Sequence, residues 1–215
     1  MKVDKSSMLL YAVTERSWLK NRSLPDAVEE ALKAGVTFLQ LREKDLDYDS
    51  FLQIAIEIKK ITDKYKIPYV INDNVDVAIA CGADGVHVGQ EDMDAKDVRK
   101  IIGSDKILGV SAETVEQAIK AEQSGADYLG VGAVFPSPTK LDADVVSFEA
   151  LKEICKAVSI PVVAIGGINE DNAMKLAGSG IAGIAVISGI FAQDDIAAAV
   201  KRLYQISSRL VSHEA

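Results

Sequence analysis

The 215-residue sequence lacks the features that define several large classes of protein. Its two cysteines, Cys81 and Cys155, are too few for a disulfide framework or a cysteine-based zinc site, and we expect a cytoplasmic location. No stretch approaches the roughly 20 apolar residues of a membrane-spanning helix, so no membrane partner is expected. Lysine and arginine number 24 against 32 acidic residues and form no basic block, which argues against non-specific binding of nucleic acid.

The sequence does have apolar residues in the proportion of a folded domain. Hydrophobic residues make up 48% of the chain, which is ample for a packed core. Since no linker or low-complexity segment interrupts the chain, we expect residues 1–215 to form a single domain. A net charge of -8 means that an anionic substrate needs local cations, backbone amides or a metal ion to hold it.

Short β-rich runs recur along the chain, and each is followed by a stretch with helical periodicity, such as 49–65. The expected strands are 8–14, 37–42, 69–72, 85–88, 107–111, 128–131, 162–165 and 183–187. Nearly continuous apolar strands that alternate with helices are typical of a parallel sheet covered by helices. We therefore predict an α/β fold, a (β/α)8 barrel. The alternative is an open doubly wound sheet, but the first turn, 14–17, lacks the glycine-rich sequence that would favour it.

Polar residues at the ends of the expected strands are candidates for a site, because barrels of this type bind their substrates there. The second strand ends in Gln40, Arg42 and Lys44. Side chains alternate along a strand, so Gln40 and Arg42 share one face, while Leu39 and Leu41 face the covering helices. We expect the polar face to point into the mouth of the barrel.

Two aspartates follow neighbouring strands. Asp73 comes directly after Asn72 at the end of the third expected strand, and Asp92 follows the fourth. Mg²⁺ takes oxygen ligands from one or two carboxylates and completes its shell with water and substrate phosphates, so the pair predicts a magnesium site. Each aspartate could equally cap the helix that follows it, because both segments are good capping sequences.

The remaining strand ends indicate phosphate binding. Ser111 ends the fifth strand, where it could also cap a helix, and the long connection 132–142 after the sixth predicts a mobile lid that delivers Lys140. Gly167 and Ser188 follow the seventh and eighth strands, each beside a second glycine. Glycines let backbone amides approach a phosphate, and these two loops are the usual phosphate site of such barrels.

Seven segments, in order from the second strand to the eighth, together resemble the thiamine-phosphate synthase family. They are QLREK (40–44), ND (72–73), GVHVGQED (85–92), GVSA (109–112), PSPTK (136–140), IGGI (165–168) and VISGI (186–190). The resemblance implies a barrel enzyme with two small phosphorylated substrates. It would condense 4-amino-2-methyl-5-(diphosphooxymethyl)pyrimidine with 4-methyl-5-(2-phosphoethyl)thiazole, through a pyrimidinylmethyl cation, to give thiamine phosphate and pyrophosphate.

The resemblance also implies roles for individual residues. Asp73 and Asp92 would bind Mg²⁺. The pyrimidine diphosphate would be bound by Gln40, Arg42, Lys44, Asn72, Ser111 and Lys140, of which Arg42, Lys44, Ser111 and Lys140 would be catalytic. The thiazole phosphate would be bound by Ser137, Thr139, Gly167, Ile187 and Ser188.

Three other functions fit a barrel of this kind. A thiazole tautomerase would place a catalytic histidine near 132–135, where there is none. A sugar-phosphate isomerase would display an obvious glutamate or lysine base, and none stands out. A non-catalytic phosphate sensor would need neither the paired aspartates nor the lysine of the lid. We expect His87, inside the apolar run 85–88, to be a core residue. The sequence leaves the oligomeric state open.

Overall fold

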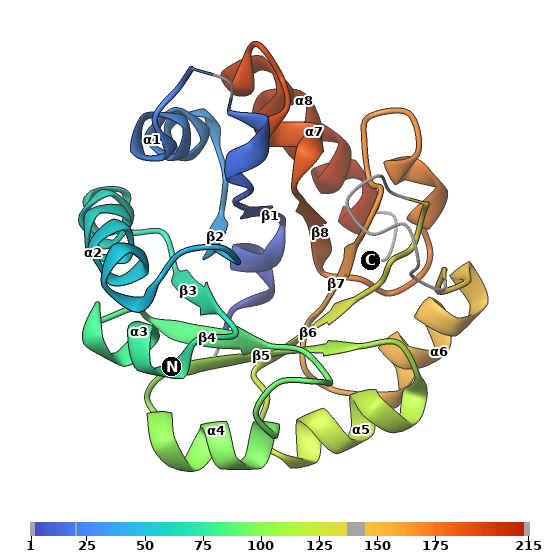
Figure 1. Ribbon diagram of the computed structural model, residues 1–215. Helices are drawn as coiled ribbons and strands as arrows, with labels where there is room; N and C mark the ends of the chain where they lie inside the picture. The colour runs from blue at the N-terminus through green and yellow to red at the C-terminus, as the bar shows by residue number, and fades with distance from the viewer. Residues whose placement is uncertain (1–2, 20, 137–144, 213–215) are drawn as a thin grey trace.

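The computed structural model describes residues 3–19, 21–136 and 145–212. Eight parallel strands close into a barrel in chain order, as Figure 1 shows in a view along the barrel. The strands are β1 (Leu10–Val13), β2 (Phe38–Leu41), β3 (Tyr69–Asn72), β4 (Gly85–Val88), β5 (Ile107–Ala112), β6 (Tyr128–Val131), β7 (Val162–Ile165) and β8 (Gly183–Val186). Closure comes from the pairing of β1 with β8, in which Leu10 is in register with Ile184. The predicted (β/α)8 barrel is confirmed, and the open sheet is wrong.

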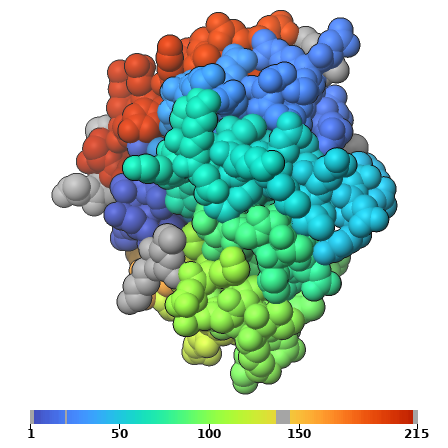
Figure 2. Space-filling view, turned by 90° about the vertical axis from the view of Figure 1, so that its left-hand side faces the viewer, coloured from blue at the N-terminus to red at the C-terminus, as the bar shows by residue number. Residues whose placement is uncertain are grey.

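Helices surround the barrel and cover its outer face. They are α1 (Leu24–Ala34), α2 (Tyr48–Tyr65), α3 (Val75–Ala80), α4 (Ala95–Ile102), α5 (Val115–Gln123), α6 (Phe148–Ala157), α7 (Ser188–Phe191) and α8 (Ile196–Ser212). Short 3-10 turns add η1 (Lys5–Met8), η2 (Arg16–Trp18) and η3 (Ala173–Leu176), which stands between β7 and β8. Figure 2 shows one side of this ring, where the blue, cyan and green parts of the chain adjoin.

Strand residues alternate between two hydrophobic cores, one inside the barrel and one between barrel and helices. On β2, Leu39 and Leu41 pack outward with the helices, while Phe38 packs inward with Tyr11, Val70 and other strand residues. This alternation confirms the faces predicted for β2 and puts Gln40 inside the barrel.

The first two strands are shorter than the sequence predicts. Met8 belongs to η1 rather than to β1, and Arg42 lies beyond the end of β2. The 3-10 turn begins where the Asp4 side chain accepts a hydrogen bond from the amide of Ser6, which draws the chain out of the extended conformation. Among the described residues, no helix is long and apolar enough to cross a membrane.

Candidate active site

The described residues among those predicted for the site lie where the strands end, at one end of the barrel. Three of them, Gln40, Asn72 and Ser111, occupy inward positions near the ends of β2, β3 and β5. Each lies two residues after an inward-facing residue of the same strand, which is Phe38, Val70 and Gly109 respectively. Ile187 and Ser188 follow β8 directly. Ser137, Thr139 and Lys140, and with them the predicted lid, lie outside the described residues.

Arg42 is held in place from the first loop. Its backbone amide donates a hydrogen bond to Thr14 Oγ1 at 2.9 Å, and its Nη1 lies 2.5 Å from Glu15 Oε2. The side chain keeps 27% of its surface exposed, so its remaining guanidinium hydrogens can still reach a ligand. Glu15 was not predicted as part of the site. Its partner is 27 residues away in sequence, and nothing local in the first turn indicates the pair.

Asp73 and Asp92 face each other across the ends of β3 and β4. Burial and a hydrogen bond with the neighbouring Asp92 carboxylate raise the pKa of Asp73 to about 6, against the opposite influence of Lys44 and Asn72. Asp92 Oδ2 also accepts a hydrogen bond from the backbone amide of Gly89 at 2.7 Å.

Neither aspartate caps a helix. Asn74 caps α3 by accepting from the amide of Val77 at 2.9 Å, and Asp94 caps α4. The capping alternative is therefore wrong for Asp73 and Asp92, and both carboxylates remain available to a ligand. Ser111 is not a cap either, because Thr114 caps α5 in a capping box with Gln117.

The aspartate pair has the chemistry of a magnesium site that is completed by a substrate. A bound cation would stabilise Asp73 in its charged form, because it offsets the burial and the repulsion from the neighbouring Asp92 carboxylate that together raise the pKa of Asp73. Within residues 3–19, 21–136 and 145–212, no group of three or more histidine, cysteine, aspartate or glutamate side chains is placed to hold a metal. Since Mg²⁺ takes few protein carboxylates and keeps positions for water and phosphate oxygens, this donor set fits Mg²⁺ together with a diphosphate.

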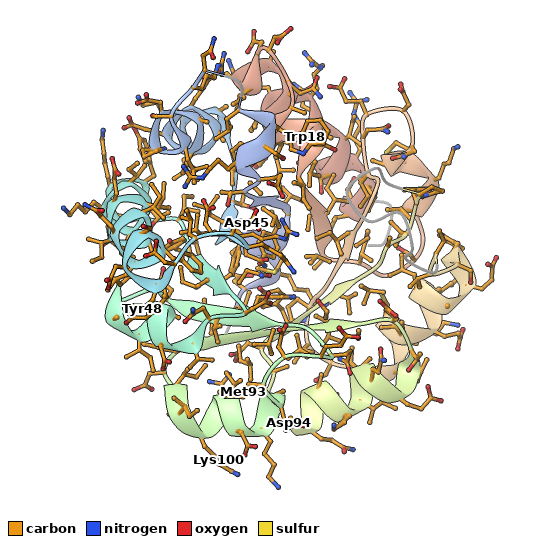
Figure 3. The ribbon with its side chains drawn as sticks, in the orientation of Figure 1. Trp18, Asp45, Tyr48, Met93, Asp94 and Lys100 are labelled. Atoms are coloured by element: carbon orange, nitrogen blue, oxygen red, sulfur yellow. The ribbon has the colours of Figure 1, made fainter. Side chains whose placement is uncertain are left out.

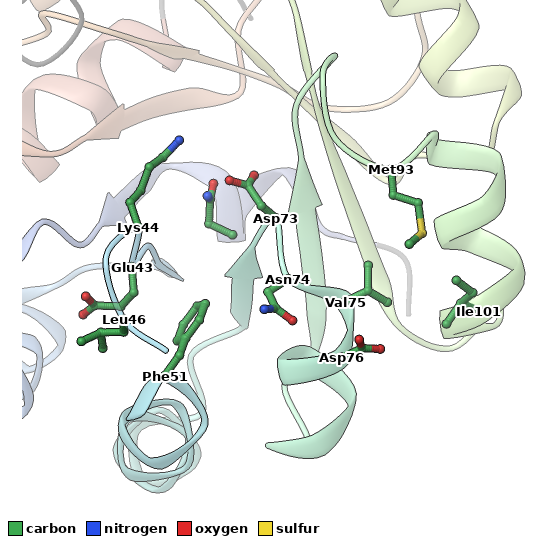
Figure 4. A pocket seen from close by; sticks show the side chains of 11 residues that line it. Glu43, Lys44, Leu46, Phe51, Asp73, Asn74, Val75, Asp76, Met93 and Ile101 are labelled. Carbon is green, nitrogen blue, oxygen red and sulfur yellow. The ribbon is translucent and has the colours of Figure 1, made fainter. Parts of the chain in front are cut away.

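A cavity of about 440 Å³ opens beside the aspartate pair. Lys44, Asn72 and Asp73 contribute to its lining, and Figure 4 shows the Lys44 ammonium and the Asp73 carboxylate on the same side of it. The rest of its wall includes Phe51 of α2 and Ile101 of α4. The structure thus brings Lys44, Asn72 and Asp73 together as predicted.

Ser111 is joined to Gln40 by hydrogen bonds that cross the inside of the barrel. Gln40 Nε2 lies 2.5 Å from Tyr11 Oη, which lies 2.7 Å from Tyr128 Oη. His87 Nδ1 lies 2.9 Å from Tyr128 Oη, and His87 Nε2 lies 2.9 Å from Ser111 Oγ. We name these five residues the barrel relay. His87 is buried, as predicted for a core histidine, but its contact with Ser111 was not predicted.

The inner members of the barrel relay are uncharged at neutral pH. Burial lowers the pKa of His87 to about 4, with a small opposing influence of Asp92. Burial also raises the pKa values of Tyr11 and Tyr128 above that of an ordinary tyrosine. Each hydroxyl and each ring nitrogen therefore acts as a neutral donor or acceptor.

The loops after β7 and β8 adjoin at the opposite side of the mouth. Gly167 has φ +65°, and a side chain at this position would come within 2.7 Å of Phe135 O and 2.6 Å of Pro136 O. A side chain at Gly189 would come within 3.3 Å of Ile168 O, so the two loops are in close contact. Only glycine allows the backbone at 167 to lie so close to Phe135 and Pro136. The contact between the two loops brings Gly167 near Ile187 and Ser188, as predicted.

Trp18 lies in the first loop, at the end of η2. Its indole nitrogen is buried, and among the described residues it has no hydrogen-bond partner. The sequence assigned no role to Trp18.

The closed parallel barrel, with the predicted site residues at the carboxyl ends of its strands, has the architecture of the (β/α)8 enzymes. Comparison with known proteins gives the family. The sequence model of the family described as "Thiamine monophosphate synthase" matches residues 10–190.

Individual relatives agree. A thiamine-phosphate synthase from Clostridium tetani is 57% identical over 194 residues, covering 90% of this chain and 93% of the relative. One from Ruminiclostridium cellulolyticum is 54% identical, covering 94% and 97%. The solved structure of thiamine phosphate pyrophosphorylase from Pyrococcus furiosus superimposes with a TM-score of 0.88 at 38% identity, covering 96% and 98%. The chain belongs to the thiamine-phosphate synthase family, whose enzymes join a pyrimidine and a thiazole in thiamine phosphate. The predicted family and enzyme class are confirmed.

Proposed function

We propose that this enzyme condenses 4-amino-2-methyl-5-(diphosphooxymethyl)pyrimidine with 4-methyl-5-(2-phosphoethyl)thiazole in a magnesium-assisted reaction, with the two substrates held at opposite sides of the barrel mouth. The observation that carries the proposal is the pair Asp73 and Asp92 beside Lys44, because neither aspartate is used to cap a helix. A family of synthases at 57% and 54% identity supports this function over that of a tautomerase, a sensor or an isomerase.

The diphosphate side of the site binds the leaving group. Arg42 and Lys44 offer their positive charge, and Asn72 offers its amide, to the oxygens of the diphosphate. Bound Mg²⁺, held by Asp73 and Asp92, would neutralise part of the negative charge on these oxygens. Lys140, which lies outside the described residues, completes this set through the family resemblance.

The chemistry divides into breaking one bond and forming another. The carbon–oxygen bond of the pyrimidinylmethyl diphosphate breaks, and its electron pair leaves on the oxygen of pyrophosphate. The pyrimidinylmethyl cation is then captured by the lone pair of the thiazole nitrogen, which forms the new carbon–nitrogen bond. No protein nucleophile and no proton transfer is needed, so catalysis consists of stabilising the leaving charge and aligning the two partners.

The opposite side of the mouth aligns the second substrate. Backbone amides near Gly167, Ile187 and Ser188 bind the phosphate of the thiazole, assisted by Ser137 and Thr139 outside the described residues. We also propose a cytoplasmic location, which the low cysteine count of two supports.

Binding of inorganic pyrophosphate tests the metal and diphosphate site without turnover. Calorimetric titration of the wild type is expected to show binding only when Mg²⁺ is present, and Asp73→Asn is expected to weaken it at least tenfold. Asp97→Asn is the matched control, because Asp97 pairs with Lys100 at 2.7 Å and Lys100 points away from the barrel in Figure 3. Equal affinity with and without Mg²⁺, or an Asp73→Asn variant that binds as tightly as the control, contradicts the proposal.

A further inference from the structure

The barrel relay connects the two residues that flank the proposed pyrimidine subsite. Gln40 stands at its β2 end and Ser111 at its β5 end, with Tyr11, Tyr128 and His87 between them. Gln40, Tyr11, Tyr128 and His87 are each less than 8% exposed. The relay is therefore a continuous line of buried polar contacts that reaches the mouth of the barrel at both ends.

Two glycines on the inner face of the barrel make room for the relay. A side chain at Gly109 would come within 2.2 Å of the Tyr128 ring and within 2.5 Å of His87 Nδ1. A side chain at Gly130 would come within 3.2 Å of His87 Cε1. Apolar side chains could fill this space without desolvating three polar groups, so packing alone does not account for the arrangement.

Hydrogen-bond chemistry allows the relay two polarities, because each neutral group between its ends accepts one bond and donates the other. In the first, Gln40 Nε2 donates to Tyr11, Tyr11 to Tyr128, and Tyr128 to His87 Nδ1. His87 then carries its proton on Nε2 and donates to Ser111 Oγ, which leaves the serine hydroxyl hydrogen free to donate into the site. In the second polarity every bond is reversed, and the Ser111 hydroxyl donates its hydrogen to His87 Nε2.

The aminopyrimidine of the substrate distinguishes these polarities. Its exocyclic amino group donates a hydrogen bond, and the adjacent ring nitrogen accepts one. In the first polarity, Gln40 gives one amide hydrogen to Tyr11 and keeps its carbonyl oxygen and second amide hydrogen for this edge. In the second, the amide turns its oxygen toward Tyr11, so its donor and acceptor exchange places and no longer match a ring that is held in the same position.

We propose that binding of the aminopyrimidine at Gln40 fixes the barrel relay in the first polarity and so makes Ser111 a hydrogen-bond donor to the departing pyrophosphate oxygen. Tyr11, Tyr128 and His87 are positioning residues that act through Ser111. This inference rests on the proposed function of Gln40 and Ser111.

The effect on the reaction is electrostatic. As the carbon–oxygen bond breaks, both of its electrons go to the oxygen of pyrophosphate, and the Ser111 hydroxyl stabilises the growing negative charge without giving up its proton. In the second polarity a serine lone pair faces the same oxygen. The relay thus links recognition of the ring to departure of the leaving group.

A double-mutant cycle tests the inference through kcat. Ser111→Ala removes the donor, and Tyr128→Phe removes the hydroxyl that keeps His87 Nδ1 an acceptor. We expect each to lower kcat about tenfold to a hundredfold, with a smaller change in KM. This is a smaller loss than removal of an oxyanion-hole donor typically causes. The double variant is expected to lose no more than the single variants, because Tyr128 acts only through Ser111. Tyr69→Phe is the control, since Tyr69 Oη bonds to Ala55 O outside the barrel.

The outcomes separate this inference from the proposed function. If Ser111→Ala keeps the wild-type kcat, the proposed role of Ser111 is wrong and the inference fails with it. If Ser111→Ala lowers kcat but Tyr128→Phe does not, or if the two losses multiply, the inference alone is overturned.

The tautomer of His87 provides a test that needs no variant. The chain has two histidines, His87 and His213, so the ¹⁵N spectrum of histidine-labelled wild-type protein is simple. With 4-amino-5-hydroxymethyl-2-methylpyrimidine bound, we expect His87 to carry its proton on Nε2. A proton on Nδ1 in this complex overturns the inference.

Discussion

The backbone amide of Asp73 donates a hydrogen bond to the carbonyl oxygen of His87 at 2.8 Å. This bond extends the ladder between β3 and β4 beyond its last registered pair, Asn72 and His87. Asp73 has φ +62°, a conformation that few residues other than glycine adopt, and the bond helps to hold it there. Thus His87 helps to position Asp73 through its backbone and contacts Ser111 through its side chain.

Substitution of Gly167 is expected to impair binding of the thiazole phosphate. A side chain at Gly167 would meet Phe135 O and Pro136 O at 2.7 and 2.6 Å and displace the start of the adjoining loop. We expect Gly167→Ala to raise the KM for the thiazole phosphate at least tenfold, with a smaller effect on the pyrimidine diphosphate. Steady-state kinetics with each substrate varied in turn measures both.

Gly178→Ala is the control for this substitution. Gly178 has φ +83° and so shares the backbone strain of a positive φ, but a side chain there meets nothing within 4 Å. If both variants change the KM equally, strain rather than the site explains the effect, and the assignment of Gly167 is refuted.

Replacement of Arg42 by lysine is expected to weaken binding of the diphosphate although the charge is kept. The planar guanidinium can bond to Glu15 and to a ligand at once, whereas an ammonium is a single point charge. We expect the KM for the pyrimidine diphosphate to rise about tenfold. Arg202→Lys, on α8 in an ion pair with Glu170, is the matched control. An unchanged KM for Arg42→Lys would show that this residue does not hold the diphosphate.

Burial of neutral His87 predicts a pH-dependent stability. Its pKa of about 4 in the folded protein lies below the 6.5 of an ordinary histidine, so between these two pH values the unfolded chain binds more protons than the folded one. The stabilisation that neutral His87 contributes is therefore complete above pH 6.5 and is lost as the pH falls toward about 4. From pH 7 to pH 5 the advantage of the wild type over His87→Gln should shrink by about 2 kcal/mol. Urea unfolding at both pH values measures it, and a constant difference contradicts the burial of a neutral imidazole.

The sequence predicts the barrel and most strand ends because these depend on local patterns. Outward Leu39 and Leu41 alternate with inward Gln40, and the predicted helix 49–65 begins one residue later than α2. Asp73 illustrates the limit of such patterns. In the run 72–74 any residue could cap the next helix, and only the backbone decides that Asn74 does.

The barrel relay could not be predicted because its contacts join residues far apart in the chain. Tyr11 and Tyr128 are separated by 117 residues, and Tyr128 and His87 by 41. No local sequence pattern shows that two inward side chains meet across a closed barrel. The one available signal was glycine at inward strand positions, Gly109 and Gly130, which indicates that a large group approaches closely.

Pyrophosphate release with the pyrimidine diphosphate and the thiazole phosphate, measured with and without Mg²⁺, tests the central claim most directly. The wild type is expected to release pyrophosphate only when both substrates and the metal are present, and Asp92→Ala is expected to lose at least a hundredfold in rate, while Asp97→Asn stays at the wild-type rate. Pyrophosphate release at the same rate with and without Mg²⁺, or an Asp92→Ala variant as active as the control, would contradict the assignment of the aspartate pair. No release by the wild type under any of these conditions would contradict the proposed function itself.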